Sequence, residues 1–210
     1  MEKKQIGKLI FVRHALSEWN SLGIWTGVTD VHLSEEGFSV ARKMGELLKN
    51  FCFDYIFDTP LIRTKETLLA ILEANSLTKK DVPIVEAKEL IERDYGDYTG
   101  KNKWQVKEEI GEEEFIKIRR SWDYPIPNGE SLKMVYDRSV PYYLNEILPL
   151  VKEGKNVLIV AHGNSLRALS KYIESMSDVE INNFEIDFDA VTIYDLDQNG
   201  HMVSKEIKKV

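Results

Sequence analysis

Two histidines in this 210-residue sequence directly follow short aliphatic runs, a placement that suits phosphoryl-transfer chemistry. His14 follows Leu-Ile-Phe-Val-Arg, and His162 follows Val-Leu-Ile-Val-Ala. Such runs are typical of strands buried on both faces of a parallel sheet, and ligands bind such sheets at the carboxyl ends of their strands. His162-Gly163-Asn164 also leads into a predicted helix, whose free backbone N–H groups favour an anion. We therefore predict that the two histidines meet at one anion site, with phosphate as the natural candidate.

Two arginines fit the same chemistry. Arg13 directly precedes His14, and Arg63 lies one turn inside a helix predicted to start near Pro60. Each guanidinium offers a planar fork of donors to phosphoryl oxygens. A neutral imidazole can attack phosphorus, and the transfer then depends on positioning and on neutralising the charge of the equatorial oxygens. A phosphohistidine on one of the two rings, with Arg13, Arg63 and the other histidine around the phosphoryl group, would need no metal.

Transfer to or from a hydroxyl also needs a proton donor and acceptor, and the stretch 90–100 offers two carboxylates. Glu92 or Asp94 would fill this role if partial burial or a nearby anion raised its pKa. The alternative is a charged loop in which Tyr95 packs on the core. The residue types alone do not separate these interpretations.

The elements that must position these residues follow an alternating pattern. Short runs rich in Ile and Val alternate with segments of helical period, which predicts one α/β domain over 1–210 with three α/β/α layers and a mainly parallel sheet. A charged, poorly periodic stretch at about 101–124 is predicted as a helical insertion over the active site. Strands are predicted over 8–12, 54–58, 156–161 and 190–196, a hairpin turn at Asn199-Gly200, and helices after Ser34, from near Pro60 to about Ala74, after Ser131 and after Asn164.

Composition narrows the function classes. The net charge of −7 argues against a nucleic-acid or anionic-membrane surface, so we expect a small phosphorylated metabolite as the partner of a monomer or small homo-oligomer. The N-terminus is polar, and the apolar run after it is too short for a signal peptide or a membrane span, which predicts a cytoplasmic protein. Cys52, the single cysteine, is predicted to be a buried structural thiol.

Taken together and in order, these motifs resemble the cofactor-dependent phosphoglycerate mutases of the histidine phosphatase superfamily. The resemblance covers almost the whole chain and includes Arg13-His14, Glu92-Arg93 and His162-Gly163. The matching segments are 11–14, 17–20, 25–31, 33–37, 92–97, 100–103, 119–123, 128–132 and 161–167.

The resemblance implies a phosphoglycerate mutase-like fold and an isomerase of glycolysis and gluconeogenesis. Such an enzyme interconverts 3-phosphoglycerate and 2-phosphoglycerate, with 2,3-bisphosphoglycerate as primer and no metal. It also implies that His14 is the phosphorylated nucleophile, that Arg13, Arg63 and His162 surround the phosphate, and that Glu92 is the acid/base. The residues implied to bind substrate are Ser17, Asn20, Thr26, Gly27, Tyr95, Lys103, Arg119, Arg120, Gly163 and Asn164.

Within the superfamily, the paired arginine favours a mutase over a phosphatase. Tyr95, Lys103, Arg119 and Arg120 match the positions that hold the glycerate and its carboxylate in the mutases, and phosphatases of the superfamily generally lack this set. Two alternatives remain. One is a phosphatase of small phosphorylated metabolites that uses the same phosphohistidine chemistry. The other is a catalytically silent relative that only binds phosphorylated ligands or a protein partner.

The sequence departs from the mutase pattern at three places. Ala15 stands where the family has glycine, which tests whether this position needs a positive φ. Asp94 stands where the mutases usually have His or Tyr. Asp187 and Asp189 lie where the mutases have a Thr-Gly turn, and their charges are expected to repel a bisphosphate.

Overall fold

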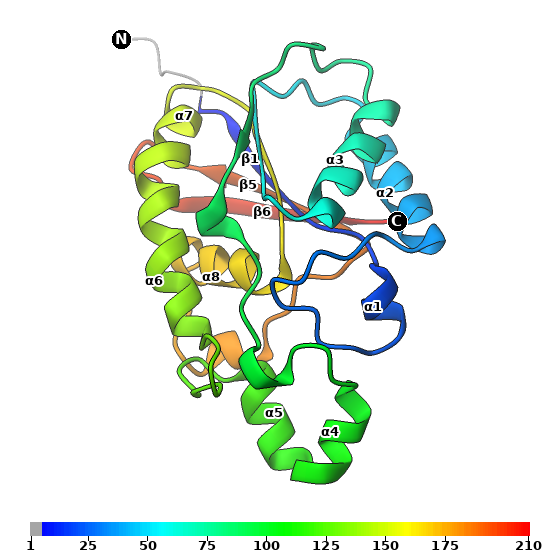
Figure 1. The fold of residues 1–210 in the computed structure, drawn as a ribbon. Helices are drawn as coiled ribbons and strands as arrows, with labels where there is room; N and C mark the ends of the chain where they lie inside the picture. The colour runs from blue at the N-terminus through cyan, green and yellow to red at the C-terminus, as the bar shows by residue number, and fades with distance from the viewer. Residues whose placement is uncertain (1–5) are drawn as a thin grey trace.

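The computed structural model describes residues 6–210, which fold around one mixed sheet (Figure 1). The strand order is β3-β2-β4-β1-β5-β6. The first four of these strands run parallel, β5 is antiparallel to β1, and β6 is antiparallel to β5. The strands are β1 (Lys8–Arg13), β2 (Tyr55–Asp58), β3 (Ile84–Glu86), β4 (Val157–Ala161), β5 (Ala190–Leu196) and β6 (Met202–Lys209).

Helices cover both faces of the sheet, because successive residues of its central strands point to opposite sides. Leu9 and Phe11 of β1 enter one hydrophobic cluster, and Ile10 and Val12 enter the other. Figure 1 shows α6 and α8 on one side of the sheet and α2 and α3 on the other, which confirms the predicted layers. The helices on the faces are α2 (Glu35–Leu47) and α3 (Ile62–Ala74) on one, and α6 (Leu132–Tyr142), α7 (Leu148–Lys152) and α8 (Gly163–Ile173) on the other.

The helix starts follow their capping residues. The Ser34 hydroxyl accepts a hydrogen bond from the Gly37 N–H, and the Ser131 hydroxyl accepts one from the Met134 N–H, so α2 and α6 begin where predicted. Helix α8 begins at Gly163, two residues earlier than expected, because His162 and not Asn164 is its N-cap. The short elements are α1 (Glu18–Ser21), η1 (Lys88–Leu90), η2 (Gly96–Tyr98), the π-helical turn η3 (Tyr143–Ile147) between α6 and α7, and η4 (Glu180–Asn183).

The charged stretch predicted as an insertion forms two helices, α4 (Lys103–Ile110) and α5 (Glu112–Arg120), which lie beyond one end of the sheet in Figure 1. The two helices turn at Gly111, whose φ of +85° suits glycine. Their apolar sides pack into a cluster of their own around Trp25 and Phe115. The buried Arg93 donates to the Ile118 carbonyl and so ties α5 to the main body.

Two local expectations are resolved at once. Cys52 is exposed, so the prediction of a buried thiol was wrong; the neighbouring Phe53 turns inward instead. Ala15 is buried and is not among the residues with positive φ, so glycine is not required there.

The predicted hairpin at Asn199-Gly200 joins β5 to β6. Within residues 6–210, no helix has the length and apolar character that crossing a bilayer would require.

Candidate active site

The sheet brings His14 and His162 together. Strands β1 and β4 are parallel neighbours in which Arg13 pairs with Ala161, so the residues that follow leave the sheet at the same edge. The His14 N–H donates to the Ala161 carbonyl at 2.8 Å. The two imidazole rings are buried, with their centroids 5.1 Å apart at an interplanar angle of 60°.

The hydrogen bond of the His14 ring fixes its tautomer. Nδ1 lies 2.8 Å from the Ala15 carbonyl oxygen. Because a carbonyl oxygen only accepts, Nδ1 carries the hydrogen and the Nε2 lone pair is left for a nucleophilic role. Burial lowers the pKa of His14 well below its ordinary value of 6.5, and the positive charges of Arg63 and Arg13 lower it further. The ring is therefore neutral at physiological pH, as a nucleophile must be.

His162 stands behind His14 as the N-cap of α8. Its Nε2 lies 2.9 Å from the Thr59 hydroxyl, which is itself 2.9 Å from the Thr64 hydroxyl. Its Nδ1 is buried and has no hydrogen-bond partner among the described residues. Burial, followed by the charge of Arg63, lowers the pKa of His162 well below 6.5 as well.

The opposite pKa shifts of the histidines give a direct test by NMR. His32 is exposed, and its Nδ1 lies 2.6 Å from Glu66 Oε1, so this carboxylate raises the His32 pKa. Between pH 8 and pH 5.5 we expect the His32 ring to titrate above 6.5, whereas His14 and His162 stay neutral. Long-range proton–nitrogen correlation spectra, assigned with single His→Gln variants, report each ring separately. A His14 ring that gains its proton at or above pH 6.5 would contradict the account of its surroundings.

The two predicted arginines reach this edge from different elements. Arg63, in the first turn of α3, is fully buried and donates to the Gly27 and Thr29 carbonyls, each at 2.8 Å. Burial lowers its pKa to about 10, which leaves the guanidinium charged at neutral pH. Arg13 donates to the Ile186 carbonyl at 2.8 Å and stacks on Phe188 at 3.5 Å.

Buried polar atoms without partners gather around His14. They are the Nε atoms of Arg13 and Arg63, the Thr26 hydroxyl and His162 Nδ1, none of which meets a hydrogen-bond partner within residues 6–210. Buried polar groups are normally paired, since an unpaired group costs about 1–3 kcal/mol. Such a concentration of unpaired groups at one place marks a site that is completed by a polar, anionic ligand.

Glu92 is the carboxylate that reaches the histidines. One oxygen of Glu92, one ring nitrogen of His14 and one of His162 all lie within 4.8 Å of one another. The Glu92 Oε1 accepts hydrogen bonds from the Arg93 N–H at 2.7 Å and from Asn164 Nδ2 at 2.9 Å. Asp94 instead accepts a bond from the Gly96 N–H at 2.8 Å and closes its own turn.

The loop that carries Glu92 is held from behind by Arg138 of α6. The Arg138 guanidinium donates to the Glu89 carbonyl at 2.7 Å and to the Glu92 carbonyl at 3.1 Å. It also pairs with both carboxylate oxygens of Glu130, at 2.9 and 3.0 Å. Glu130 in turn accepts from the Asp94 N–H at 3.0 Å. Many bonds from one side chain therefore fix the backbone on both sides of Glu92.

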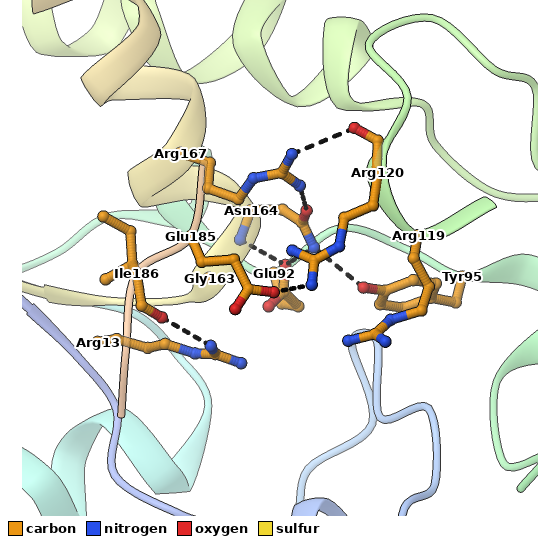
Figure 2. A pocket seen from close by; sticks show the side chains of 10 residues that line it. All are labelled: Arg13, Glu92, Tyr95, Arg119, Arg120, Gly163, Asn164, Arg167, Glu185 and Ile186. Carbon is orange, nitrogen blue, oxygen red and sulfur yellow. Dashed lines mark hydrogen bonds and ion pairs between the residues drawn. The ribbon is translucent and has the colours of Figure 1, made fainter. Parts of the chain in front are cut away.

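Two adjoining pockets share Arg13, Glu92 and Tyr95. The first surrounds His14, and the second lies toward α5 and is shown in Figure 2. The remaining residues of the first are Asn20, Trp25, Thr26, Gly27, Arg63 and Lys103. Those of the second are Arg119, Arg120, Gly163, Asn164, Arg167, Glu185 and Ile186.

The structure thus brings nearly all of the predicted site residues to one place, in spite of the net charge of −7. Two of them line neither pocket: His162, whose ring lies against that of His14, and Ser17. Ser17 acts indirectly. Its buried hydroxyl caps α1 and lies 2.8 Å from Asn20 Oδ1, so it orients Asn20 from behind.

Two charged pocket residues, Arg167 and Glu185, were not predicted to be site residues. Arg167 donates to Asn164 Oδ1 at 3.0 Å and to the Ile181 carbonyl at 2.7 Å. Its spacing of three residues from Asn164 on a predicted helix is a signal that could have found it. Glu185 forms an ion pair with Arg120 and lies in an irregular segment that has no sequence signal.

Burial lowers the pKa of Arg13, whereas the charge of Asp187 is among those that raise it, so Asp187 acts on a pocket residue from a distance. The expected repulsion of a bisphosphate by Asp187 and Asp189 stays a prediction. Neither lines the two pockets, and Asp187 pairs with Lys209 of β6 at 2.6 Å. The carboxylate of this segment that enters a pocket is that of Glu185.

Comparison with known proteins agrees with this geometry. The sequence model of the histidine phosphatase superfamily (branch 1) matches residues 9–207. A 2,3-bisphosphoglycerate-dependent phosphoglycerate mutase of Parvibaculum lavamentivorans is 43% identical over 201 residues, which cover 95% of each chain. The same-named protein of Nitrobacter hamburgensis is 42% identical over 94% of this chain and 95% of its own. Among solved structures, Bacillus stearothermophilus YhfR shares the fold, with a TM-score of 0.80 at 23% identity over 93% of this chain and 94% of its own.

Proposed function

This chain belongs to the histidine phosphatase superfamily, and from that membership we infer that it interconverts 3-phosphoglycerate and 2-phosphoglycerate in a reaction primed by 2,3-bisphosphoglycerate. Two proteins named 2,3-bisphosphoglycerate-dependent phosphoglycerate mutase match 95% and 94% of the chain at 43% and 42% identity. The single observation that carries the proposal is a neutral His14, with Nε2 unprotonated, among unpaired buried donors and next to a second pocket that holds Arg119 and Arg120.

In the proposed priming step, the Nε2 lone pair of His14 attacks a phosphorus atom of 2,3-bisphosphoglycerate. A P–N bond forms, the P–O bond to the glycerate breaks, and the leaving oxygen takes a proton from the carboxylic acid of Glu92. Arg13, Arg63 and the Nδ1 of His162 offer donors to the three equatorial oxygens, where the charge of the transition state is concentrated.

In the return step, the hydroxyl of a bound monophosphoglycerate loses its proton to Glu92 and attacks the phosphohistidine. The P–N bond breaks and 2,3-bisphosphoglycerate forms again. Reorientation of this intermediate presents its other phosphate to His14, and transfer of that group releases the isomer. The cationic residues Lys103, Arg119 and Arg120 are proposed to hold the rest of the intermediate while it turns, which keeps water from the phosphohistidine.

A metal ion is not part of the proposal. His14, Glu92 and His162 are close enough to serve as ligands for one. However, Arg13 and Arg63 lower the pKa values of the rings, which means that they oppose a further positive charge at this position. We propose that the site takes a phosphoryl group in this place. We also propose that the reaction runs in the cytoplasm, with a free small metabolite as substrate.

One assay separates the proposal from its two alternatives. The purified protein is incubated with 3-phosphoglycerate, with and without 2,3-bisphosphoglycerate, while 2-phosphoglycerate and free phosphate are followed together. We expect 2-phosphoglycerate to appear at a rate that depends on the primer. Release of phosphate without isomerisation would instead identify a phosphatase, and the absence of both products a silent relative.

The paired arginine gives a second test of the substrate. In the double variant Arg119→Ala and Arg120→Ala, we expect the KM for 3-phosphoglycerate to rise by about 10²-fold, since each lost charge-assisted bond is worth about 1.5–3 kcal/mol. Hydrolysis of p-nitrophenyl phosphate, which has no carboxylate, should change by less than about threefold. Lys117→Ala is the matched control, because Lys117 lies on the same helix, does not line the pocket and pairs with Glu113. Equal losses on both substrates would remove the reason to prefer a mutase.

A further inference from the structure

An ion pair spans the mouth of the pocket that faces α5. The Glu185 carboxylate, in the segment after η4, contacts the guanidinium of Arg120, as Figure 2 shows. Arg119, on the neighbouring position of α5, has no side-chain hydrogen bond or ion pair within residues 6–210. The two arginines proposed to bind the same substrate group are therefore in different states: one is already paired with a carboxylate of the chain itself.

The ion pair between Glu185 and Arg120 lies where the inner pocket meets an outer groove. Arg119, Arg120 and Glu185 line the inner pocket and also line an outer groove of about 580 Å³ along α4 and α5. A ligand that reaches the inner pocket from this groove passes the pair. The Glu185 side chain is 48% exposed and that of Arg120 is 27% exposed, so the pair remains in contact with water. Pairs of this kind are weak, and a ligand carboxylate held by both arginines can displace Glu185.

The position of Glu185 is distinct from that of the other pocket carboxylate. Glu92 is buried, and its Oε1 bonds with the Asn164 amide and the Arg93 N–H, both parts of the fixed wall. Glu185 has no other hydrogen-bond or ion-pair partner than Arg120 within the described residues. Its charge is therefore directed at one guanidinium and can leave that guanidinium without exposing an unpaired group to an apolar surface.

We propose that Glu185 is a specificity-determining residue that occupies Arg120 until an anionic group of the ligand displaces it. The inference rests on the proposed function in that the ligand is a phosphoglycerate. A ligand with a carboxylate beside its phosphate gains both arginines but must break the pair. A ligand with phosphate alone leaves the pair in place and binds only at His14. Glu185 therefore lowers the affinity for phosphoglycerates selectively and eases their release.

The test is calorimetric titration of the full-length, unphosphorylated protein with 3-phosphoglycerate in the absence of the primer. In Glu185→Gln we expect the Kd to fall by about twofold to fivefold, the range that exposed ion pairs correspond to. The Kd for inorganic phosphate should stay the same. Glu180→Gln is the matched control: it removes the same charge nearby, where the Glu180 carboxylate accepts a hydrogen bond from the Ser177 N–H. Unchanged or weaker binding of 3-phosphoglycerate in Glu185→Gln would overturn the proposal.

A double-variant cycle separates competition for Arg120 from a general effect of charge. In an Arg120→Gln background, Glu185→Gln should no longer tighten binding of 3-phosphoglycerate, because the guanidinium for which Glu185 competes with the ligand is absent. Tightening of the same size in that background would show that Glu185 acts through the field of the whole pocket, and would overturn the proposal.

Failure of this inference can be told from failure of the proposed function. If 3-phosphoglycerate binds with the expected pattern but is not isomerised, the mutase assignment fails and the role of Glu185 stands. If isomerisation proceeds and Glu185→Gln leaves the Kd unchanged, the role of Glu185 fails and the mutase assignment stands. A chain that does not bind 3-phosphoglycerate at all contradicts both.

Discussion

Replacement of His14 by Gln is expected to lower the rate of 2-phosphoglycerate formation by at least about 10⁴-fold, the scale on which loss of a catalytic nucleophile acts. The Gln amide can occupy the space of the ring but has no lone pair of comparable nucleophilicity for phosphorus. The neighbouring ring is not an equivalent nucleophile in this account, because His162 Nε2 is engaged with the Thr59 hydroxyl and its Nδ1 is proposed to donate to the phosphoryl oxygens. The same variant should take up no covalent label from phosphate-labelled 2,3-bisphosphoglycerate.

The control is His32→Gln, which removes an exposed histidine that pairs with Glu66 and lines neither pocket. This variant should retain the activity and the label of the unchanged protein. A His14→Gln protein that keeps more than about a tenth of the activity would show that the phosphoryl group travels by another route.

The second large effect is expected for Glu92→Gln, with a fall in kcat of about 10²–10⁴-fold, the usual contribution of a general acid–base residue. The Gln oxygen can still accept from the Asn164 amide and the Arg93 N–H, so the fold and the pocket wall should be preserved. What the variant loses is the ability to give a proton to the leaving oxygen and to take one from the incoming hydroxyl.

A loss of rate that depends on the leaving group of the phosphoryl donor would identify Glu92 as the general acid. Phosphorylation of the enzyme by p-nitrophenyl phosphate should suffer much less in Glu92→Gln than phosphorylation by 2,3-bisphosphoglycerate, because nitrophenolate leaves without a proton. Asp94→Asn tests the neighbouring carboxylate and should cost little, since Asp94 closes a turn with the Gly96 N–H. Equal losses with both phosphoryl donors, or a larger loss in Asp94→Asn, would assign the acid elsewhere.

Much of this site was predictable because it is built on strand ends. The aliphatic runs before His14 and His162 predict buried parallel strands, and parallel neighbours place their last residues at one edge whatever the intervening chain does. The structure follows this rule: Arg13 pairs with Ala161 at the ends of the parallel strands β1 and β4. Arg63 could be predicted in the same way, since the start of a helix after a third parallel strand lies at the same edge of the sheet.

The remaining parts depend on contacts that no local pattern encodes. Whether Glu92 or Asp94 reaches the histidines is decided by the path of an irregular loop, which Arg138 holds from an element far along the chain. Glu185 lies in a segment without helical or strand period, so its neighbour Arg120 could not be inferred. Cys52 was misjudged for a related reason: an apolar run in a connection can alternate inward and outward, and here Phe53 took the inward place.

The site also shows how an acidic protein can bind an anionic substrate. The chain carries a net charge of −7, yet Arg13, Arg119, Arg120 and Arg167 line one small pocket. Clefts focus the field of the charges that line them, and the surrounding acidic surface is screened by salt over about 10 Å. The local arrangement, not the total charge, therefore decides which ligand is attracted.

The most direct test of the central claim is a pulse and chase of the phosphoryl group. The protein is treated with phosphate-labelled 2,3-bisphosphoglycerate, digested at alkaline pH to preserve the P–N bond, and mapped by mass spectrometry; a second portion is chased with unlabelled 3-phosphoglycerate. The account predicts one phosphoryl group on His14 and its transfer to 2,3-bisphosphoglycerate and 2-phosphoglycerate. A label on any other residue, or its release as free phosphate alone, would contradict it.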